Sequence, residues 1–365
     1  MPFKLPPKPG FLTANSSQTK SGIEELKPSI GKNSMKYYLG VDVGGTKTHA
    51  LIADETGHAQ GFATGGPGNW EGVGYDGLTR VLLDVTCRAM DQARIKVDQI
   101  VGAGMGIGGY DWPSERQDHL HAIRPIGLAC PIEIVNDATL GILAGTSEGW
   151  GVSVVAGTGC NARGWSRDHK RQGRAVGGGG YWSGEYAGGF DIVARAMQAV
   201  TFEWLKRGPA TALTQVFLEH TGAKDLDALV EGVYLQRYPF DSTWVLKVFE
   251  TARHSDLQAQ AVMRWAGREL GEMALGIINQ LDLKKERFEV VLIGSLHGGS
   301  PILDETLRKT ILEVAPQASF VRLTVPPVIG GVLLGMEEAG LNGYAMRDLL
   351  IDTTKALMQK ERVGR

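Results

Sequence analysis

The chain has 365 residues, a formal charge of −2 at neutral pH and a pI near 6.5. A single hydrophobic core seldom grows beyond about 250–300 residues, so we expect two lobes. The near-neutral charge excludes binding to nucleic acid or membranes through a broad basic surface, and it favours a small-molecule ligand. Three widely spaced cysteines, Cys87, Cys130 and Cys160, form neither a disulfide framework nor a zinc motif. We therefore expect a reducing, cytoplasmic location.

The first 36 residues differ in composition from the rest of the chain. They contain five prolines, six lysines and two acidic residues without hydrophobic periodicity, which predicts a flexible leader. A transit sequence is the alternative, but this segment lacks arginine and an apolar face. No apolar run in the chain reaches the roughly 18 residues that suggest a membrane span. We expect no membrane association.

From Tyr37 onward the hydrophobic pattern predicts an antiparallel three-stranded meander, then a helix, then alternating strands and helices. Alternating units indicate parallel strands joined by crossover helices. The expected strands of this first unit lie near 37–43, 49–54, 60–65, 100–104 and 132–135, and its helices near 75–94, near 114–123 and from Asp137 onward.

The same order of elements begins again at Gly151. The expected strands lie near 151–156, 160–165, 174, 288–294 and 319–325, and the helices span about 190–281 and begin again at Pro301 and Val328. We therefore expect an α/β fold in which two βββαβαβα units face one another across a cleft. The predicted parts are a leader (1–36), an N-terminal lobe (37–146), a C-terminal lobe with a helical insertion (147–343) and a C-terminal helix (344–365).

Each unit opens with a hairpin whose turn is rich in glycine and threonine, GGTK at Gly44, Gly45, Thr46 and Lys47, and GTG at Gly157, Thr158 and Gly159. Such turns expose backbone N–H groups and suit phosphate oxygens, although one such turn alone is as often an ordinary hairpin. Asp42, at the end of the first strand, could then hold the magnesium ion of a nucleoside triphosphate; a turn-capping residue is the alternative.

Two further segments suggest a reaction site. Asp137 follows a strand directly and could accept a proton from an attacking hydroxyl, while its simpler role is to cap the next helix. The neighbouring Asn136 could orient this acid or contact the substrate. Gly294, Ser295 and Gly298 follow a later strand and could leave room for an adenine ring, although a plain strand-to-helix turn fits as well.

The chain's 50 glycines, about twice the usual share, cluster at 102–109, 157–164, 173–189 and 294–299, and we expect these clusters to be functional loops.

Five segments in register resemble a known family. VDVGGTKT, GPGNW, VNDATLGILAG, VSVVAGTGCNARG and VVLIGSLHGGSP, in this order, are similar to the actin-like ATPase fold of sugar kinases. The closest resemblance is to the N-acetylglucosamine kinase branch of the BadF/BadG/BcrA/BcrD ATPase family, which also includes archaeal hexokinases, and it extends from about Tyr37 to about Gly340. The resemblance implies an enzyme that uses ATP and Mg²⁺.

The resemblance also implies roles for individual residues. It makes the two glycine turns the phosphate loops, Asp137 the general base, Asn69 a sugar contact, and Gly294 and Ser295 part of the adenosine pocket. Trp70 could stack on the sugar, with a buried structural role as the alternative. The family's Gly-Asp-Glu-Gly motif is altered, because Gly184 stands at the Asp position and only Glu185 remains acidic. Gly177 and Gly178 lie where the family has its substrate turn.

The leading hypothesis is a kinase that transfers the γ-phosphoryl group of ATP to a hexose or amino sugar, foremost N-acetylglucosamine to its 6-phosphate. Glucose, glucosamine or another sugar is an alternative acceptor. Other candidate functions are an ATPase that activates a partner enzyme through an iron–sulfur cluster, a sugar-responsive transcription regulator, and a dinucleotide-dependent dehydrogenase suggested by Gly104, Gly106 and Gly109. The sequence does not specify the sugar or the subunit number, and it leaves a homodimer open.

Overall fold

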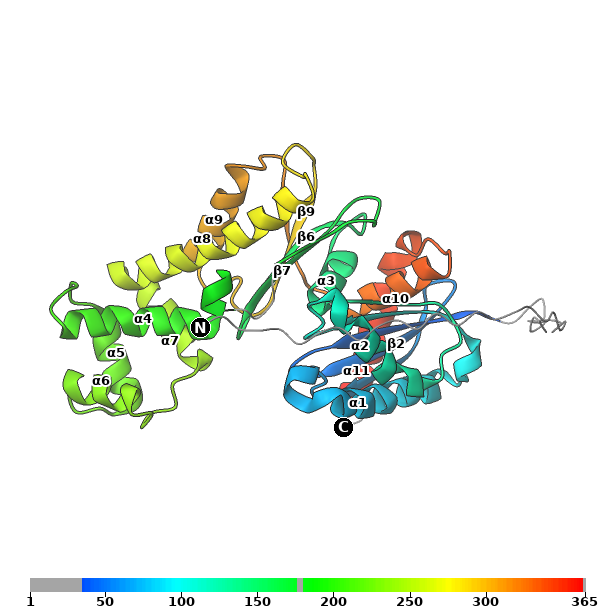
Figure 1. Cartoon of the computed structure of the whole chain (residues 1–365), viewed down its shortest axis with the longest axis horizontal. Coiled ribbons are helices and arrows are strands. Elements are labelled where there is room, and N and C mark those ends of the chain that lie inside the picture. Colours follow the sequence, from blue (N-terminus) through cyan, green and yellow to red (C-terminus); the bar gives the residue numbers. More distant parts are fainter. Residues whose placement is uncertain (1–34, 176–179, 364–365) are drawn as a thin grey trace, which may run out of the picture. The chain divides into compact units, whose positions relative to one another are not determined.

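The computed structural model describes residues 35–175 and 180–363. The chain folds into two five-stranded mixed sheets with helices around them (Figure 1). The first sheet has the order β3-β2-β1-β4-β5 and the second the order β10-β9-β6-β7-β8. The strands are β1 (Tyr37–Val43), β2 (Thr48–Asp54), β3 (Ala59–Gly65), β4 (Ile100–Ile107), β5 (Ile132–Val135), β6 (Gly151–Ala156), β7 (Cys160–Trp165), β8 (Gln172–Arg174), β9 (Glu289–Ile293) and β10 (Ser319–Arg322).

The two sheets have the same topology. In each, the first three strands form an antiparallel meander, and two more strands then add in parallel on the free side of the first strand. Parallel neighbours need crossover connections, which the intervening helices provide. The predicted α/β fold with a duplicated strand pattern is confirmed. The dehydrogenase alternative is not supported, because Gly104 and Gly106 lie inside β4 rather than in a turn before a helix.

Helices complete both halves. They are α1 (Trp70–Ala93), α2 (Arg116–Ile123), α3 (Asp137–Gly145), α4 (Gly189–Trp204), α5 (Ala212–Thr221), α6 (Leu226–Tyr234), α7 (Val245–Arg253), α8 (Leu257–Gln280), α9 (Pro301–Leu312), α10 (Val328–Glu338) and α11 (Arg347–Val363). Short 3₁₀ turns are η1 (Val97–Gln99), η2 (Pro113–Glu115), η3 (Arg124–Ile126), η4 (Gly180–Ser183), η5 (Ser242–Trp244) and η6 (Tyr344–Met346). Among the described residues no helix combines the length and the apolar character needed to cross a bilayer.

Helix α1 begins five residues before the predicted start at Tyr75. The side chain of Asn69 accepts a hydrogen bond from the Glu71 backbone N–H and so caps an added first turn. Gly74 then adopts a φ of 69°, which kinks the helix. Hydrophobic periodicity detects only the segment after this kink, because the first turn carries no regular apolar stripe.

The first sheet is covered on both faces. Leu39 and Val41 of β1 belong to the hydrophobic core that contains Leu78 and Leu82 of α1. On the other face, Tyr38 packs in the core formed by α10 and α11. Successive residues of a strand point to opposite faces of the sheet, so β1 contributes to both cores. A helix from the far end of the sequence therefore completes the first sheet (Figure 1).

Glycines allow α10 to lie directly on the strands. A Cβ atom added to Gly104 of β4 would lie 2.3 Å from the carbonyl oxygen of Gly331, and one added to Gly102 would lie 2.1 Å from that of Gly335. Across the same contact, a Cβ on Gly40 of β1 would lie 2.5 Å from the backbone nitrogen of Val332. The prediction that the glycines of 102–109 form a functional loop is therefore wrong for residues 102–106, which form a close helix–sheet contact.

The glycine contact leads to a stability prediction. We expect Gly104→Ala to lower the free energy of unfolding by about 1–3 kcal/mol, because the added methyl group overpacks the contact between β4 and α10. Urea denaturation measures the change. Gly276→Ala in α8 is the matched control, because no atom lies within 4 Å of its added Cβ. We expect this control to be neutral or stabilising, by up to about 1 kcal/mol. Equal effects of both variants would contradict the overpacking argument.

Candidate active site

The first predicted phosphate turn joins β1 to β2. The Gly44 backbone N–H donates to the Lys47 carbonyl oxygen at 3.0 Å, which closes the turn. Gly45, Thr46 and Lys47 are exposed, and no atom lies within 4 Å of a Cβ built on Gly45. The turn therefore presents open backbone to its surroundings, which is the property that an anion-binding turn requires.

The segment containing Asn69 lies against this turn. The backbone N–H groups of Gly68 and Asn69 both donate to the Gly44 carbonyl oxygen, at 3.1 and 3.4 Å. The Asn69 side chain caps α1, and its Nδ2 also donates to Glu71 Oε2 at 3.2 Å. The structure thus brings the predicted sugar contact next to the predicted phosphate turn and gives Asn69 a local structural role as well.

Trp70 has well-defined protein partners. Its Nε1 donates to the Gly109 carbonyl oxygen at 2.7 Å, and its ring stacks on Tyr75 with centroids 4.9 Å apart. His119 meets the Trp70 ring edge-on with centroids 6.3 Å apart. These contacts show that Trp70 packs against other side chains, which is the structural role considered as an alternative to stacking on a sugar. They also tie the start of α1 to the end of β4.

The second predicted phosphate turn is built like the first. Gly157 N–H donates to the Gly159 carbonyl oxygen at 2.9 Å, Thr158 is exposed, and no atom lies within 4 Å of a Cβ built on either glycine. The turn packs against the start of α4, where Gly189 N–H donates to the Gly157 carbonyl oxygen at 2.8 Å. Both turns therefore combine a closed hairpin with exposed backbone.

The predicted adenosine segment lies beside this second turn. Gly294 has a φ of 103°, and a Cβ there would lie 2.2 Å from the Ala156 carbonyl oxygen, so only glycine fits without rearrangement. Leu296 N–H donates to the same carbonyl oxygen at 3.1 Å. Gly298 N–H donates to Asp304 Oδ2 at 2.7 Å, which anchors the loop to α9. The structure thus places Gly294 next to Ala156, the residue before Gly157, and Ser295 follows in the loop between β9 and α9.

Asp137 is the first residue of α3, but it is not the cap. Asn136 takes that position, and its Oδ1 accepts from the Ala138 backbone N–H at 3.0 Å. The alternative that Asp137 is the N-cap residue of this helix is therefore wrong. Asp137 Oδ1 accepts from the same N–H at 2.9 Å. A Cβ built on Gly108 would lie 3.3 Å from Asp137 Oδ2, so the missing side chain at Gly108 leaves space beside this oxygen.

The surroundings of Asp137 raise its pKa from 3.8 to about 7. Burial makes the largest contribution, because it disfavours the charged form. The negative charges of Asp42 and Asp111 raise the pKa further, whereas the Ala138 N–H and the Arg163 guanidinium lower it. A carboxyl group with a pKa near neutrality can take up and release a proton under physiological conditions, as a general base must.

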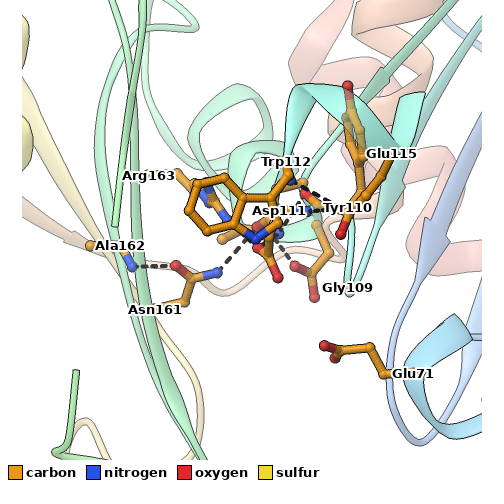
Figure 2. Close-up of polar contacts among 12 residues, drawn as sticks. Glu71, Gly109, Tyr110, Asp111, Trp112, Glu115, Asn161, Ala162 and Arg163 are labelled. Atoms are coloured by element: carbon orange, nitrogen blue, oxygen red, sulfur yellow. Dashed lines mark hydrogen bonds and ion pairs between the residues drawn. The ribbon is translucent and has the colours of Figure 1, made fainter. Parts of the chain in front are cut away.

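Two residues of this site escaped the sequence analysis, Asp111 and Arg163. Asp111 follows β4, and its Oδ1 forms an ion pair with Nη2 of Arg163 in β7 (Figure 2). Asn136 Nδ2 donates to the same Oδ1 at 3.1 Å, and Asn161 Nδ2 donates to Asn136 Oδ1 at 3.3 Å. The sequence clue is an arginine between apolar and small residues in the segment ARGW, because a charge buried there requires a partner.

Burial also governs the ionisation of Asp111. It raises the pKa of Asp111 from 3.8 to about 6 despite the opposing Arg163 charge, and Glu71, Glu115 and Glu185 add to the increase. Glu185, the acidic residue kept from the altered motif, is 7% exposed, and its negative charge contributes to the raised pKa of Asp111. The neighbouring Gly184 has a φ of 76°, and no atom lies within 4 Å of a Cβ built on it. The predicted substrate residues Gly177 and Gly178 lie outside the described residues.

Asp42 has the environment of a ligand for a nucleotide-borne cation. Its side chain is 16% exposed, and its Oδ2 lies 3.8 Å from Nδ1 of His49. The part of the chain that the structure describes contains no cluster of three or more metal-ligating side chains. Mg²⁺ bound with a nucleotide typically takes one or two carboxylates and completes its shell with phosphate oxygens and water. Asp42 beside an exposed glycine turn fits that requirement.

The fold and these features define a class of protein: a duplicated α/β molecule with two matched glycine turns and carboxylates at strand ends. The model of the BadF/BadG/BcrA/BcrD ATPase family matches residues 39–335. The chain belongs to this family, as its five sequence segments predicted.

Two curated relatives are similar over nearly their full length. An N-acetyl-D-glucosamine kinase from Dictyostelium discoideum is 28% identical over 327 residues, covering 84% of this chain and 99% of the relative. An N-acetylmuramic acid/N-acetylglucosamine kinase from Clostridium acetobutylicum is 24% identical over 308 residues, covering 83% and 99%. A solved structure described as a putative N-acetylglucosamine kinase from Chromobacterium violaceum aligns with a TM-score of 0.59 at 23% identity, covering 82% and 99%.

The raised pKa of Asp137 leads to a prediction about stability. A raised folded-state pKa means that folding takes up a proton, so this residue's contribution to stability is lost as the pH rises from about 4 through 7. Asp137→Asn keeps the Oδ1 acceptor and removes the charge. We expect the free energy of unfolding of the variant, relative to that of the wild type, to be roughly 1–3 kcal/mol higher at pH 8 than at pH 5. Urea denaturation at both pH values provides the measurement, and a pH-independent difference would contradict it.

Proposed function

We propose that this protein is an ATP-dependent sugar kinase that transfers the γ-phosphoryl group to a hydroxyl of a hexose or amino sugar, foremost the 6-hydroxyl of N-acetylglucosamine. The observation that carries the proposal is Asp137, a carboxyl group with a pKa of about 7 at the start of α3. The names of the two curated relatives support N-acetylglucosamine as the acceptor.

In the proposed reaction the acceptor hydroxyl attacks the γ-phosphorus of ATP. Its oxygen forms the new P–O bond, its proton passes to the Asp137 carboxylate, and the bond between the γ-phosphorus and the bridging oxygen breaks. ADP leaves with the electron pair of that bond. Proton acceptance by a positioned base typically contributes a factor of about 10²–10⁴ to the rate.

The two glycine turns would hold the triphosphate. Gly44 and Gly45 with Thr46 and Lys47 form one donor group, and Gly157 to Gly159 form the other. The Lys47 ammonium would offset phosphate charge. Asp42 would hold Mg²⁺, which offsets charge on the phosphoryl oxygens when bound. Gly294, Ser295 and Gly298 would line the adenosine side, since they lie beside the second turn.

The sugar would lie on the side of Asn69, Asn136 and Asp137. Asn69 is hydrogen-bonded through its backbone to the first turn, and Asn136 adjoins the proposed base. Glu185 would supply a further hydroxyl contact in place of the acid missing at Gly184, and Trp70 would support this region. All three cysteines are free, which fits the reducing, cytoplasmic setting that we expect for this reaction.

Replacing the base tests the proposal. We expect Asp137→Asn to lower kcat by about 10²–10⁴-fold, because the amide cannot accept the proton, while the Kd for ATP changes less than threefold. Coupled ADP-release assays and calorimetric ATP titrations measure the two quantities. Asp348→Asn is the control, since the side chain of Asp348 is 94% exposed on α11, and it should retain full activity. An Asp137→Asn variant with wild-type turnover would refute the assignment.

The ionisation of Asp137 predicts the pH dependence. Only the carboxylate accepts a proton, so we expect kcat/KM to fall tenfold per pH unit below an apparent pKa near 7 and to level off above it. Initial rates between pH 5.5 and 9 with saturating ATP test this expectation. A rate that stays constant down to pH 5.5 would contradict it.

A panel of acceptors tests the substrate class. Purified protein with Mg²⁺ and ATP should release ADP with N-acetylglucosamine, and glucosamine and glucose are the discriminating comparisons. Mass spectrometry of the product identifies the phosphorylated hydroxyl. Inactivity with every sugar combined with iron bound to the purified protein would favour the activator alternative instead.

A further inference from the structure

The loop after β4 contacts the second sheet through two consecutive residues. Asp111 forms its ion pair with Arg163 of β7, and the ring of Trp112 lies 5.2 Å from the Arg174 Cζ atom of β8. Arg163 and Arg174 are direct partners in the β7–β8 register, so their side chains leave the sheet on the same face. Two neighbouring arginines of the second sheet thus contact two consecutive residues that follow β4. Figure 2 shows Asp111 and Trp112 with Arg163.

The Arg163–Asp111 ion pair is enclosed. The side chain of Arg163 is 5% exposed and that of Asp111 is 12% exposed. A guanidinium this deeply buried needs its partner, because an isolated buried charge is strongly unfavourable, and the same holds for the carboxylate. Each residue therefore constrains the other more firmly than a surface ion pair would.

The contacts continue from this pair to the start of α3. Asp111 Oδ1 accepts from Asn136 Nδ2 at 3.1 Å, and Asn136 Oδ1 caps α3 at the Ala138 N–H at 3.0 Å. Asn161, two residues before Arg163 in β7, donates to the same Asn136 oxygen at 3.3 Å. Strand β7 therefore reaches the Asn136 side chain twice, directly through Asn161 and through the Arg163–Asp111 pair.

We propose that Arg163 is a positioning residue, which pairs with Asp111 to fix the Asn136 cap and thereby sets the place of Asp137 relative to the acceptor hydroxyl. This inference rests on the proposed kinase function. Arg163 acts through Asp111 and Asn136 and needs no contact with the substrate. A displacement of about 1 Å in a reacting group can cost on the order of 10² in rate, which sets the scale of the expected effect.

Charge provides an independent signature of this role. The charged groups facing Asp137 are Asp42 from β1, Asp111 from the loop after β4 and Arg163 from β7. Arg163 lowers the pKa of Asp137, and Asp111 raises it. Removing the guanidinium should therefore move the acidic limb of the rate profile to higher pH, and removing the Asp111 charge should move it to lower pH. A purely structural role predicts no such opposite shifts.

The experiment compares Arg163→Met, Arg163→Lys, Asp111→Asn and the double variant Asp111→Asn with Arg163→Met, using the full chain, N-acetylglucosamine and MgATP. We expect kcat to fall about 10–100-fold in Arg163→Met with KM for ATP within threefold of the wild type, and Arg163→Lys to restore part of the loss. The double variant should be no slower than the slower single variant, because the two residues act as a unit.

The control is a second arginine–aspartate pair, whose arginine lies in the same hairpin and whose aspartate follows α8. Arg171 Nη1 lies 3.0 Å from Asp282 Oδ2, and both side chains are more than half exposed. We expect Arg171→Met to keep kcat within twofold. Circular dichroism and thermal melting identify variants that do not fold. Should Arg163→Met unfold, Arg163→Lys and Asp111→Asn decide the question through their kcat values and the shifts of their acidic limbs.

Two negative outcomes are distinguishable. An active wild type together with folded Arg163 and Asp111 variants that keep wild-type kcat and pH profile overturns the role of Arg163 alone. Losses that multiply in the double variant also overturn it, because they show independent contributions. A wild-type protein that phosphorylates no sugar overturns the proposed function and the role of Arg163 with it.

Discussion

The site depends on burying three carboxyl groups, those of Asp42, Asp111 and Asp137, close to the buried guanidinium of Arg163. Asp42, Asp111 and Asp137 come from the ends of β1, β4 and β5, three strands that are neighbours in one sheet, so their charges act on one another. Burial raises the pKa of Asp137 most, and this repulsion raises it further; Arg163 opposes both only in part, and the pKa of Asp137 is about 7. Separated by water, the same acids would titrate near their ordinary values and none would be suited to accept a proton near neutrality.

Close packing of backbone against backbone keeps these strand ends together. Helix α10 contacts β1 and β4 through Gly40, Gly104 and Gly331, where no side chain intervenes. On the other side of α10, Gly330 lies against the backbone of Leu140 in α3, the helix that begins with Asp137. The position of the proposed base is thus linked to the first sheet through glycine contacts as well as through strand β5. Interiors packed this tightly leave little room for adjustment.

Much of this fold follows from local pattern. The two meanders, the parallel additions and both glycine turns repeat a clear order of strands and turns, and the helix at Asp137 begins where the end of β5 predicts it. Hydrophobic periodicity predicts a start of α1 that is five residues too late, because the turn between the Asn69 cap and the kink at Gly74 has no hydrophobic period. The glycine cluster of β4 suggests a loop from sequence alone, and the glycines of α10 suggest no role. The pattern of one element does not reveal which other element packs against it.

The site was accessible to sequence reasoning only in part. Asp42, Asp137 and the turns adjoin strand ends and can be recognised from their own neighbourhoods. The Arg163–Asp111 pair joins residues 52 positions apart and exists only because of the tertiary arrangement. A buried arginine in a strand indicates that some acid must lie nearby, but periodicity cannot say which one.

The packing of α10 has a consequence for biosynthesis. The first sheet is made from residues 37–135, yet the helix that covers one of its faces comes from residues 328–338. During translation the apolar face of β1 and β2 stays uncovered until nearly two hundred further residues have been synthesised and α10 can pack on it. A fragment ending after α3 would keep that face open to solvent, where it could recruit other exposed chains. Chaperones that cover exposed apolar surface would protect such a nascent chain from association.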